Sequence, residues 1–146
     1  MLLEKESLPM VAMDFMNDVH LEDVDIINDL FEHILTYEKA PNVTNKNILD
    51  TQYKIWFEHT VEHFRGEEKM MQEMAFPPYP MHKGEHYNAL AVMDNVFREW
   101  QKSEDIMVLK RYLVETLPSW LTKHIQTMDT VTAMFFKTGM SPCSIH

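Results

Sequence analysis

Three breaks divide this chain into long segments that carry apolar residues at helical spacing. The breaks are APNVTNKN at 40–47, FPPYP at 76–80 and KSED at 102–105. In the first segment the recurring positions are His20, Val24, Ile27, Phe31 and Ile34. This spacing is typical of a helix with one buried face. Only three of the 146 residues are glycine, so few tight turns are expected, and the pattern predicts an all-α protein.

The breaks also set the expected boundaries. The expected elements are an N-terminal arm over 1–16, a first helix capped by Asn17 or Asp18, and helices over about 48–74, 81–101 and 106–137. Pro118 should kink or divide the last helix, and Gly139 should stop it. Short links favour an up-down-up-down four-helix bundle over 17–138, with a tail over 139–146, in one domain spanning 1–146.

The charge and cysteine content exclude several kinds of partner. The formal net charge is −10, which argues against binding to nucleic acid or to anionic membranes. The single cysteine, Cys143, cannot form an internal disulfide, and the N-terminus shows neither a secretion signal nor a membrane span. We therefore expect a cytoplasmic protein, either a monomer or a weak oligomer.

Two pairs of side chains have the spacing of metal ligands. His63 and Glu67 are four residues apart, as are His82 and His86, so each pair lies on one face of a helix. Imidazole and carboxylate together suit iron, zinc or manganese. One such pair is a weak signal, because a charged helix surface can contain it by chance.

Two further histidines strengthen the metal hypothesis. His20 lies on the apolar face of the first helix, and His124 lies among apolar residues on the last. A histidine on an apolar face is more often a core residue with a hydrogen-bond partner than a ligand. Four helices that each place histidine inward are harder to explain that way, because buried polar groups need partners. Bundle interiors recurrently hold carboxylate-bridged metal pairs.

Asp129 is the candidate ligand with an irregular spacing. It follows His124 by five residues, which places the two side chains roughly 140° apart on a straight α-helix. A π-type turn, with one extra residue, would bring them to one side. The helix is therefore expected to be widened near 124–129 if Asp129 is a ligand.

The motifs HFRGEE, HKGEH and WLTKHIQTMD, taken in order, resemble the hemerythrin family, specifically its bacterial members, the bacteriohemerythrins. The resemblance covers about residues 17–135. It implies a non-haem di-iron centre with a bridging oxo or hydroxo group inside a four-helix bundle. The family pattern falls here on His20, His63, Glu67, His82, His86, His124 and Asp129.

The resemblance also implies a role for each residue. His82, His86 and His124 would hold one iron, His20 and His63 would hold the other, and Glu67 and Asp129 would bridge them. The second iron would keep an open position, where dioxygen binds reversibly. Trp120, Leu121 and Ile125 would line an apolar pocket around it.

His59 departs from the family pattern, because bacterial members usually carry tyrosine there. It could be an extra ligand, a hydrogen-bond partner of a ligand, or a solvated side chain at the pocket rim, and we favour the last two. Asp23, one turn beyond His20, could approach the second iron or orient a ligand. Gly66 could allow close helix contact or simply be tolerated on the outside. The acidic runs at 22–25 and 67–68 are expected to be mostly exposed, apart from Glu67.

Reversible dioxygen binding for storage, delivery or sensing is the leading functional hypothesis, which makes the protein a carrier rather than an enzyme. The chain has no room for an attached signalling domain, so a sensor would need a separate redox or signalling partner. One rival is a di-iron redox enzyme acting on dioxygen, peroxide or nitric oxide, which proton donors such as His59 and Asp23 would favour. Iron storage and a metal-free helical interaction module are the others.

Overall fold

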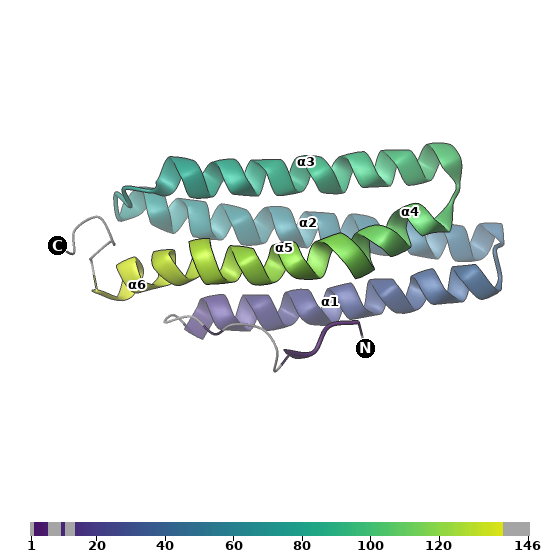
Figure 1. Cartoon of the computed structure of the whole chain (residues 1–146), viewed down its shortest axis with the longest axis horizontal. Coiled ribbons are helices and arrows are strands. Elements are labelled where there is room, and N and C mark those ends of the chain that lie inside the picture. Colours follow the sequence, from purple (N-terminus) through teal and green to yellow (C-terminus); the bar gives the residue numbers. More distant parts are fainter. Residues whose placement is uncertain (1, 6–9, 11–13, 139–146) are drawn as a thin grey trace.

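Four helical rods lie side by side in the computed structural model of this chain (Figure 1). The structure describes residues 2–5, 10 and 14–138. The first three rods are α1 (Asp14–Lys39), α2 (Val43–Glu73) and α3 (Tyr79–Ser103). Short links join consecutive rods, which alternate in direction. The predicted all-α, up-down-up-down bundle is confirmed.

The fourth rod is segmented. Its parts are α4 (Ile106–Arg111), η2 (Tyr112–Thr116), α5 (Leu117–His124), η3 (Ile125–Asp129) and α6 (Thr130–Thr138), where η marks a π-helical segment. The expected disturbance at Pro118 takes the form of η2 directly before α5. The N–H of Leu117 reaches back five residues to the carbonyl of Tyr112, so the turn before the proline is wide. Gly139, the expected stop, lies outside the described residues.

Two helices begin earlier than the sequence indicated. α1 begins at Asp14, and α2 begins at Val43 rather than near Ile48. Asn42 caps α2, because its side-chain oxygen accepts the N–H of Asn45 at 2.8 Å. A single capping residue thus ends the loop, and the polar residues after it join the first turn.

The α2–α3 link shows why the proline-rich run separates two helices. Ala75 has a left-handed backbone with φ 51°, and Phe76 donates its N–H to the carbonyl of Met71 at 2.9 Å. The turn is therefore closed before the prolines begin. Pro80 lies in the first turn of α3, where the missing N–H would have had no helical partner.

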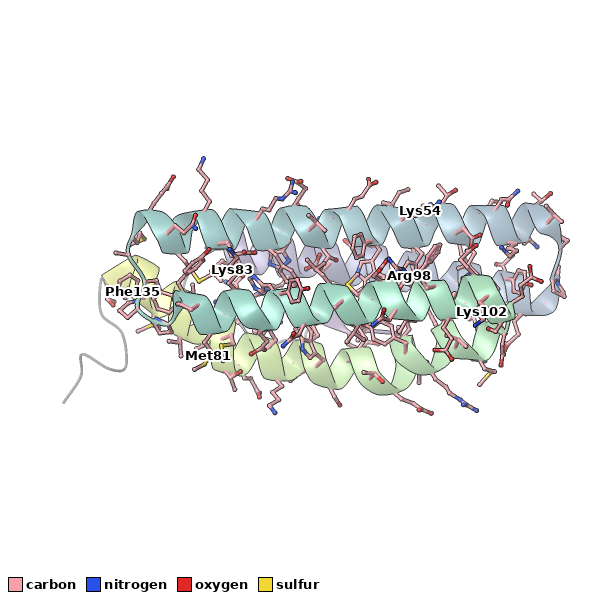
Figure 2. The ribbon with its side chains drawn as sticks, turned by 90° about the horizontal axis from the view of Figure 1, so that it is seen from above. Lys54, Met81, Lys83, Arg98, Lys102 and Phe135 are labelled. Carbon is pink, nitrogen blue, oxygen red and sulfur yellow. The ribbon has the colours of Figure 1, made fainter. Side chains whose placement is uncertain are left out.

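Two apolar clusters pack at different levels of the bundle. The main core extends from Leu121 and Ile125 to the end with the α1–α2 link, and includes Leu30, Leu49 and Trp100. A smaller end cluster lies near the α2–α3 turn and consists of Met16, Met71, Phe76, Ala133 and Phe135. Phe135 is labelled at that end in Figure 2. The rings of Phe76 and Phe135 are 4.9 Å apart.

The outside of the bundle is polar along much of its length. Lys83, Arg98 and Lys102 are exposed along α3 (Figure 2). In the N-terminal arm, Leu3 is buried and its backbone exchanges two hydrogen bonds with the Asn28 side chain on α1, at 2.8 and 3.0 Å. Within the described ranges, no helix is both long enough and apolar enough to cross a bilayer.

Candidate metal centre

All seven side chains with ligand spacing converge between the two apolar clusters. α1 supplies His20, α2 supplies His63 and Glu67, α3 supplies His82 and His86, and the fourth rod supplies His124 and Asp129. Their side chains are at most 6% exposed. Their potential ligand atoms form two groups, each within 4.8 Å, that share Glu67: one with His82, His86, His124 and Asp129, the other with His20 and His63.

Each of the two carboxylates faces both histidine groups. Glu67 places Oε1 2.9 Å from Nε2 of His63 and Oε2 3.3 Å from Nε2 of His86. Asp129 places Oδ2 2.9 Å from Nε2 of His20. Its Oδ1 lies 2.9 Å from Nε2 of His82 and 3.1 Å from Nε2 of His124. One oxygen of each carboxylate therefore serves the two-histidine group and the other serves the three-histidine group.

The protein alone does not satisfy this cluster. Oε2 of Glu67, Oδ1 of Asp129 and Nε2 of His86 are buried without an aligned hydrogen bond. Nε2 of His82 and Nε2 of His124 face each other at 3.4 Å. Buried polar atoms left in this way are costly. Cations at the convergence of these atoms would satisfy them together, so the cluster fits metal binding.

The opposite edges of the histidine rings are held by other side chains. Nδ1 of His82 lies 2.8 Å from the hydroxyl of Thr132, which itself donates to the carbonyl of Met128. The hydroxyl has one proton, so it accepts from Nδ1–H of His82, and Nε2 is left with a lone pair facing the cluster. Metal-binding histidines are usually oriented in this way.

Acidic side chains support two further rings. Oε1 of Glu85 lies 2.7 Å from Nδ1 of His124, and Oε2 of Glu68 lies 3.3 Å from Nδ1 of His86. Sequence reasoning placed Glu68 on an exposed face and missed Glu85 and Thr132. The available signal was that both acids adjoin a ligand in sequence, but sequence alone does not show which way a surface helix is rotated.

The five-residue step from His124 to Asp129 is accommodated by η3, as the spacing predicted. The N–H of Thr130 reaches back to the carbonyl of Ile125, and its hydroxyl donates to the same carbonyl at 2.7 Å. The wide turn brings Asp129 to the side of His124 and leaves it 1% exposed. π-helical turns occur frequently at functional sites for this kind of reason.

In the metal-free chain the cluster is a network of ion pairs. Burial opposes the charge of His63, but Asp23 and Glu67 outweigh it and hold the pKa of His63 well above its usual range. Burial likewise opposes the charge of Asp129, yet the histidines around it bring its pKa well below the usual range. Burial lowers the pKa of His86.

An apolar cavity extends from the cluster along the bundle axis. The space open to the centre of a water-sized molecule is about 30 Å³, which suits a ligand of two or three atoms rather than a metabolite. Its polar end is formed by His20, His63, His124 and Asp129, and its walls include Trp56, Phe64, Met93, Tyr112, Trp120 and Leu121. Trp120 also stacks on His124 at 4.7 Å.

Two residues expected near the pocket lie outside its lining. Ile125 is fully buried in the main core beside Leu121 but does not line the cavity. His59 lies one turn before His63 with 25% of its side chain exposed, and its Nδ1 is 2.8 Å from Oδ1 of Asp23. Asp23 is buried and lines the cavity. Among the described residues, the contact that links His59 to the cluster is the one with Asp23.

Comparisons with known proteins point to one family. The chain matches the family model described as the hemerythrin HHE cation binding domain over residues 11–135. It is 30% identical over 135 residues to a bacteriohemerythrin of Aquifex aeolicus (strain VF5), covering 91% of this chain and 96% of that protein.

Two other relatives have the same name. A bacteriohemerythrin of Ralstonia nicotianae is 39% identical over 71 residues, which covers 49% of this chain and 50% of that protein. One of Methylococcus capsulatus is 24% identical over 115 residues, covering 79% and 81%. No solved structure matches. The family model and the Aquifex relative both cover most of the chain, and both agree with the four-helix cluster of histidines and carboxylates: this chain belongs to the hemerythrin family.

Proposed function

We propose that this protein binds dioxygen reversibly at a non-haem di-iron centre. The main observation in support is the placement of Glu67 and Asp129. Each carboxylate has one oxygen facing the two-histidine group and the other facing the three-histidine group. That arrangement suits a pair of cations bridged by two carboxylates. The names of the three relatives add support from outside the structure.

The proposed ligands follow the two groups. His82, His86 and His124 would hold one iron, and His20 and His63 would hold the other. When bound, the two irons would supply the two electrons that dioxygen binding requires. The chain's contribution is to orient the rings, to neutralise charge with two carboxylates, and to keep the approach apolar.

The cavity favours small-ligand binding over larger substrates. It reaches His20 and His63 of the two-histidine group as well as His124 and Asp129, and its remaining walls are mostly aromatic and aliphatic. Such walls admit a small apolar molecule and limit the access of water to whatever binds there.

The test begins with metal-free protein loaded anaerobically with ferrous iron. We expect two irons per chain, a new absorption band on exposure to air, and loss of that band under vacuum. Replacing Leu121 by Phe fills the cavity, so it should weaken dioxygen binding while leaving both irons bound. The matched control is Val114→Phe on an exposed position of the same rod. A chain that holds two irons but never shows a reversible band would contradict the proposal.

One observation keeps a redox enzyme as the second candidate. Asp23 lines the cavity and contacts the partly exposed His59, so groups able to carry a proton connect the site to solvent. Steady consumption of dioxygen, peroxide or nitric oxide with an added reductant would identify this activity. A stoichiometric, reversible response without turnover would favour the carrier.

A further inference from the structure

The carboxylate of Asp23 lies between two histidines of α2. Its Oδ2 is 2.8 Å from Nδ1 of His63, and its Oδ1 is 2.8 Å from Nδ1 of His59. Both contacts are short, although neither is aligned as a hydrogen bond. Asp23 is 5% exposed, so its charge needs partners. The two imidazole rings are positioned to provide them.

The contact with His63 fixes the direction of that ring. With Nδ1 on Asp23, the opposite nitrogen, Nε2, lies 2.9 Å from Oε1 of Glu67 inside the cluster. Nε2 is therefore the atom available to a metal. His20, the other histidine of this group, has no hydrogen-bond partner at Nδ1 within the described part of the chain. Support for the two-histidine side therefore depends on Asp23.

His59 acts one step further out. It lies one turn before His63 on α2 and has 25% of its side chain exposed, and its Nε2 is 3.4 Å from Oε2 of Glu22. Through Nδ1 it occupies the Asp23 oxygen that His63 does not use. With both oxygens engaged, the carboxylate has little freedom to turn away from His63.

We infer that Asp23 and His59 are positioning residues for the metal on the two-histidine side, with Asp23 orienting His63 and His59 holding Asp23. The inference rests on the proposed metal pair. The metal affinity of this side should depend on the Asp23–His59 pair, whereas the three-histidine side depends on Glu85, Glu68 and Thr132.

The test uses zinc, a redox-silent probe, with the full-length metal-free protein. Chelator competition gives two binding constants, and imidazole ¹⁵N shifts show which histidines each zinc occupies. Asp23→Ala should weaken zinc at His20 and His63 by about 10- to 100-fold and leave zinc at the other three histidines unchanged. Asp23→Asn keeps an acceptor for His63 and should recover part of that loss. Glu85→Ala is the matched control and should weaken only the three-histidine side.

His59 is tested through Asp23. His59→Ala should weaken zinc on the two-histidine side by less than about tenfold, because water can replace part of a side chain that is already partly exposed. In the Asp23→Ala background the same change should have no further effect, since its route to His63 is gone. Urea unfolding of the metal-free variants separates positioning from general destabilisation.

Several results would overturn the inference. One is an unchanged zinc-binding constant at the two-histidine side in Asp23→Ala, and another is an equal loss of zinc affinity at both sides in that variant. The third is a His59→Ala effect that is just as large in the Asp23→Ala background as in the unaltered protein. Failure of the proposed metal pair, on which the inference rests, looks different: the unaltered protein would then take up fewer than two metals per chain.

Discussion

The two halves of the bundle solve the burial of polar groups differently. In the half distant from the metal cluster, here called the apolar half, buried polar groups form hydrogen bonds with other groups of the protein. Trp100 is fully buried, and its Nε1 donates to Oδ1 of Asp50 at 2.8 Å. The Tyr53 hydroxyl donates to the carbonyl of Met93 at 2.6 Å. The ligand half, which holds the seven-residue cluster, leaves several buried atoms without aligned partners.

The buried polar groups of the apolar half are therefore paired by the protein itself, whereas those of the ligand half need cations as partners. Stability should therefore respond to different changes in each half. The apolar half should be sensitive to side-chain volume, and the ligand half to metal and to protons.

Metal removal should have the largest effect. When the free metal concentration is a thousand times the Kd of a site, binding at that site stabilises the folded state by about 4 kcal/mol. Chelation should lower the free energy of unfolding by that amount for each metal. Amide exchange should accelerate mainly around His20, Glu67 and Asp129 and much less around Trp100. Equal acceleration in both halves would refute the comparison.

Truncation of Trp100 should show the opposite pattern. Trp100→Ala removes a large buried ring and the donor to Asp50, so it should cost about 3–5 kcal/mol of unfolding free energy. The loss should be the same with and without metal, and the metal-binding constants should not change. Trp100→Phe is the milder control. A marked loss of metal affinity in Trp100→Ala would show that the halves are coupled.

Changes in pH should separate the metal-free and metal-loaded forms. Against the opposing effect of burial, Asp129 and Glu85 raise the pKa of His124, and Asp23 and Glu67 raise that of His63. Their contribution to stability is present below an unfolded pKa of about 6.5 and is lost as pH rises through the raised folded values. Burial and Asp129 oppose the ionisation of Glu67, but His63 and His86 bring its pKa down, and the pKa of Asp129 is also lowered. Those contributions are lost as pH falls below about 4.

Above pH 6.5 the stabilisation by metal should increase with pH, whereas the stability of the metal-free form should decrease. The reason is that the cations displace protons from histidine. The stabilisation by metal should grow by about 1.4 kcal/mol per pH unit for each displaced proton. Unfolding curves between pH 6.5 and 8, with and without metal, test this. Parallel curves over that range would be the contrary result.

The hydroxyl of Thr132 offers a smaller and more local test. Thr132→Val keeps the shape but removes the acceptor for Nδ1 of His82. We expect about a tenfold loss of metal affinity on the three-histidine side. Thr127→Val is the control, because that hydroxyl lies at an exposed position and donates to the carbonyl of Lys123, away from the cluster. An equal loss in both variants would count against the role given to Thr132.

Gly66 should give the smallest effect, with the opposite sign. Apart from its chain neighbours and the nearby backbone of α2, no heavy atom lies within 4 Å of the position its Cβ would take. Of the two roles considered for this glycine, the structure therefore favours tolerance on the outside. Gly66→Ala should stabilise the protein by about 0.5–1 kcal/mol by restricting the unfolded chain. Gly84→Ala, equally unobstructed, is a second case on α3. Destabilisation in urea unfolding would show an unrecognised constraint.

The sequence predicted much of the fold and the candidate cluster because both depend on local spacing. Four-residue pairs such as His63 with Glu67 reveal a shared helix face. The irregular step to Asp129 correctly predicted a widened turn. The start of α2 was missed because Asn42 looks like any loop asparagine until its cap is seen. Glu85 was missed because a carboxylate at the edge of a buried face reads as a surface charge.

The two π-helical segments also explain a periodicity in the fourth rod. Its buried positions include Leu109, Leu113, Leu117, Leu121, Ile125, Asp129 and Ala133, one every four residues. On a regular α-helix each four-residue step rotates about 40°, so six steps would carry the stripe about 240° around the rod. Two extra residues, one in each wide turn, absorb about 200° of that rotation.

Every fourth residue of the fourth rod thus faces the core only because the two π-helical turns offset the rotation of a regular α-helix. Deleting one residue from η2, for example Val114, should turn everything before it by about 100° relative to Asp129. Leu109 would then leave the core although no ligand had been touched. The wide turn η2, just before Pro118, therefore sets the rotation of the rod so that one row of side chains faces both the apolar half and the metal cluster.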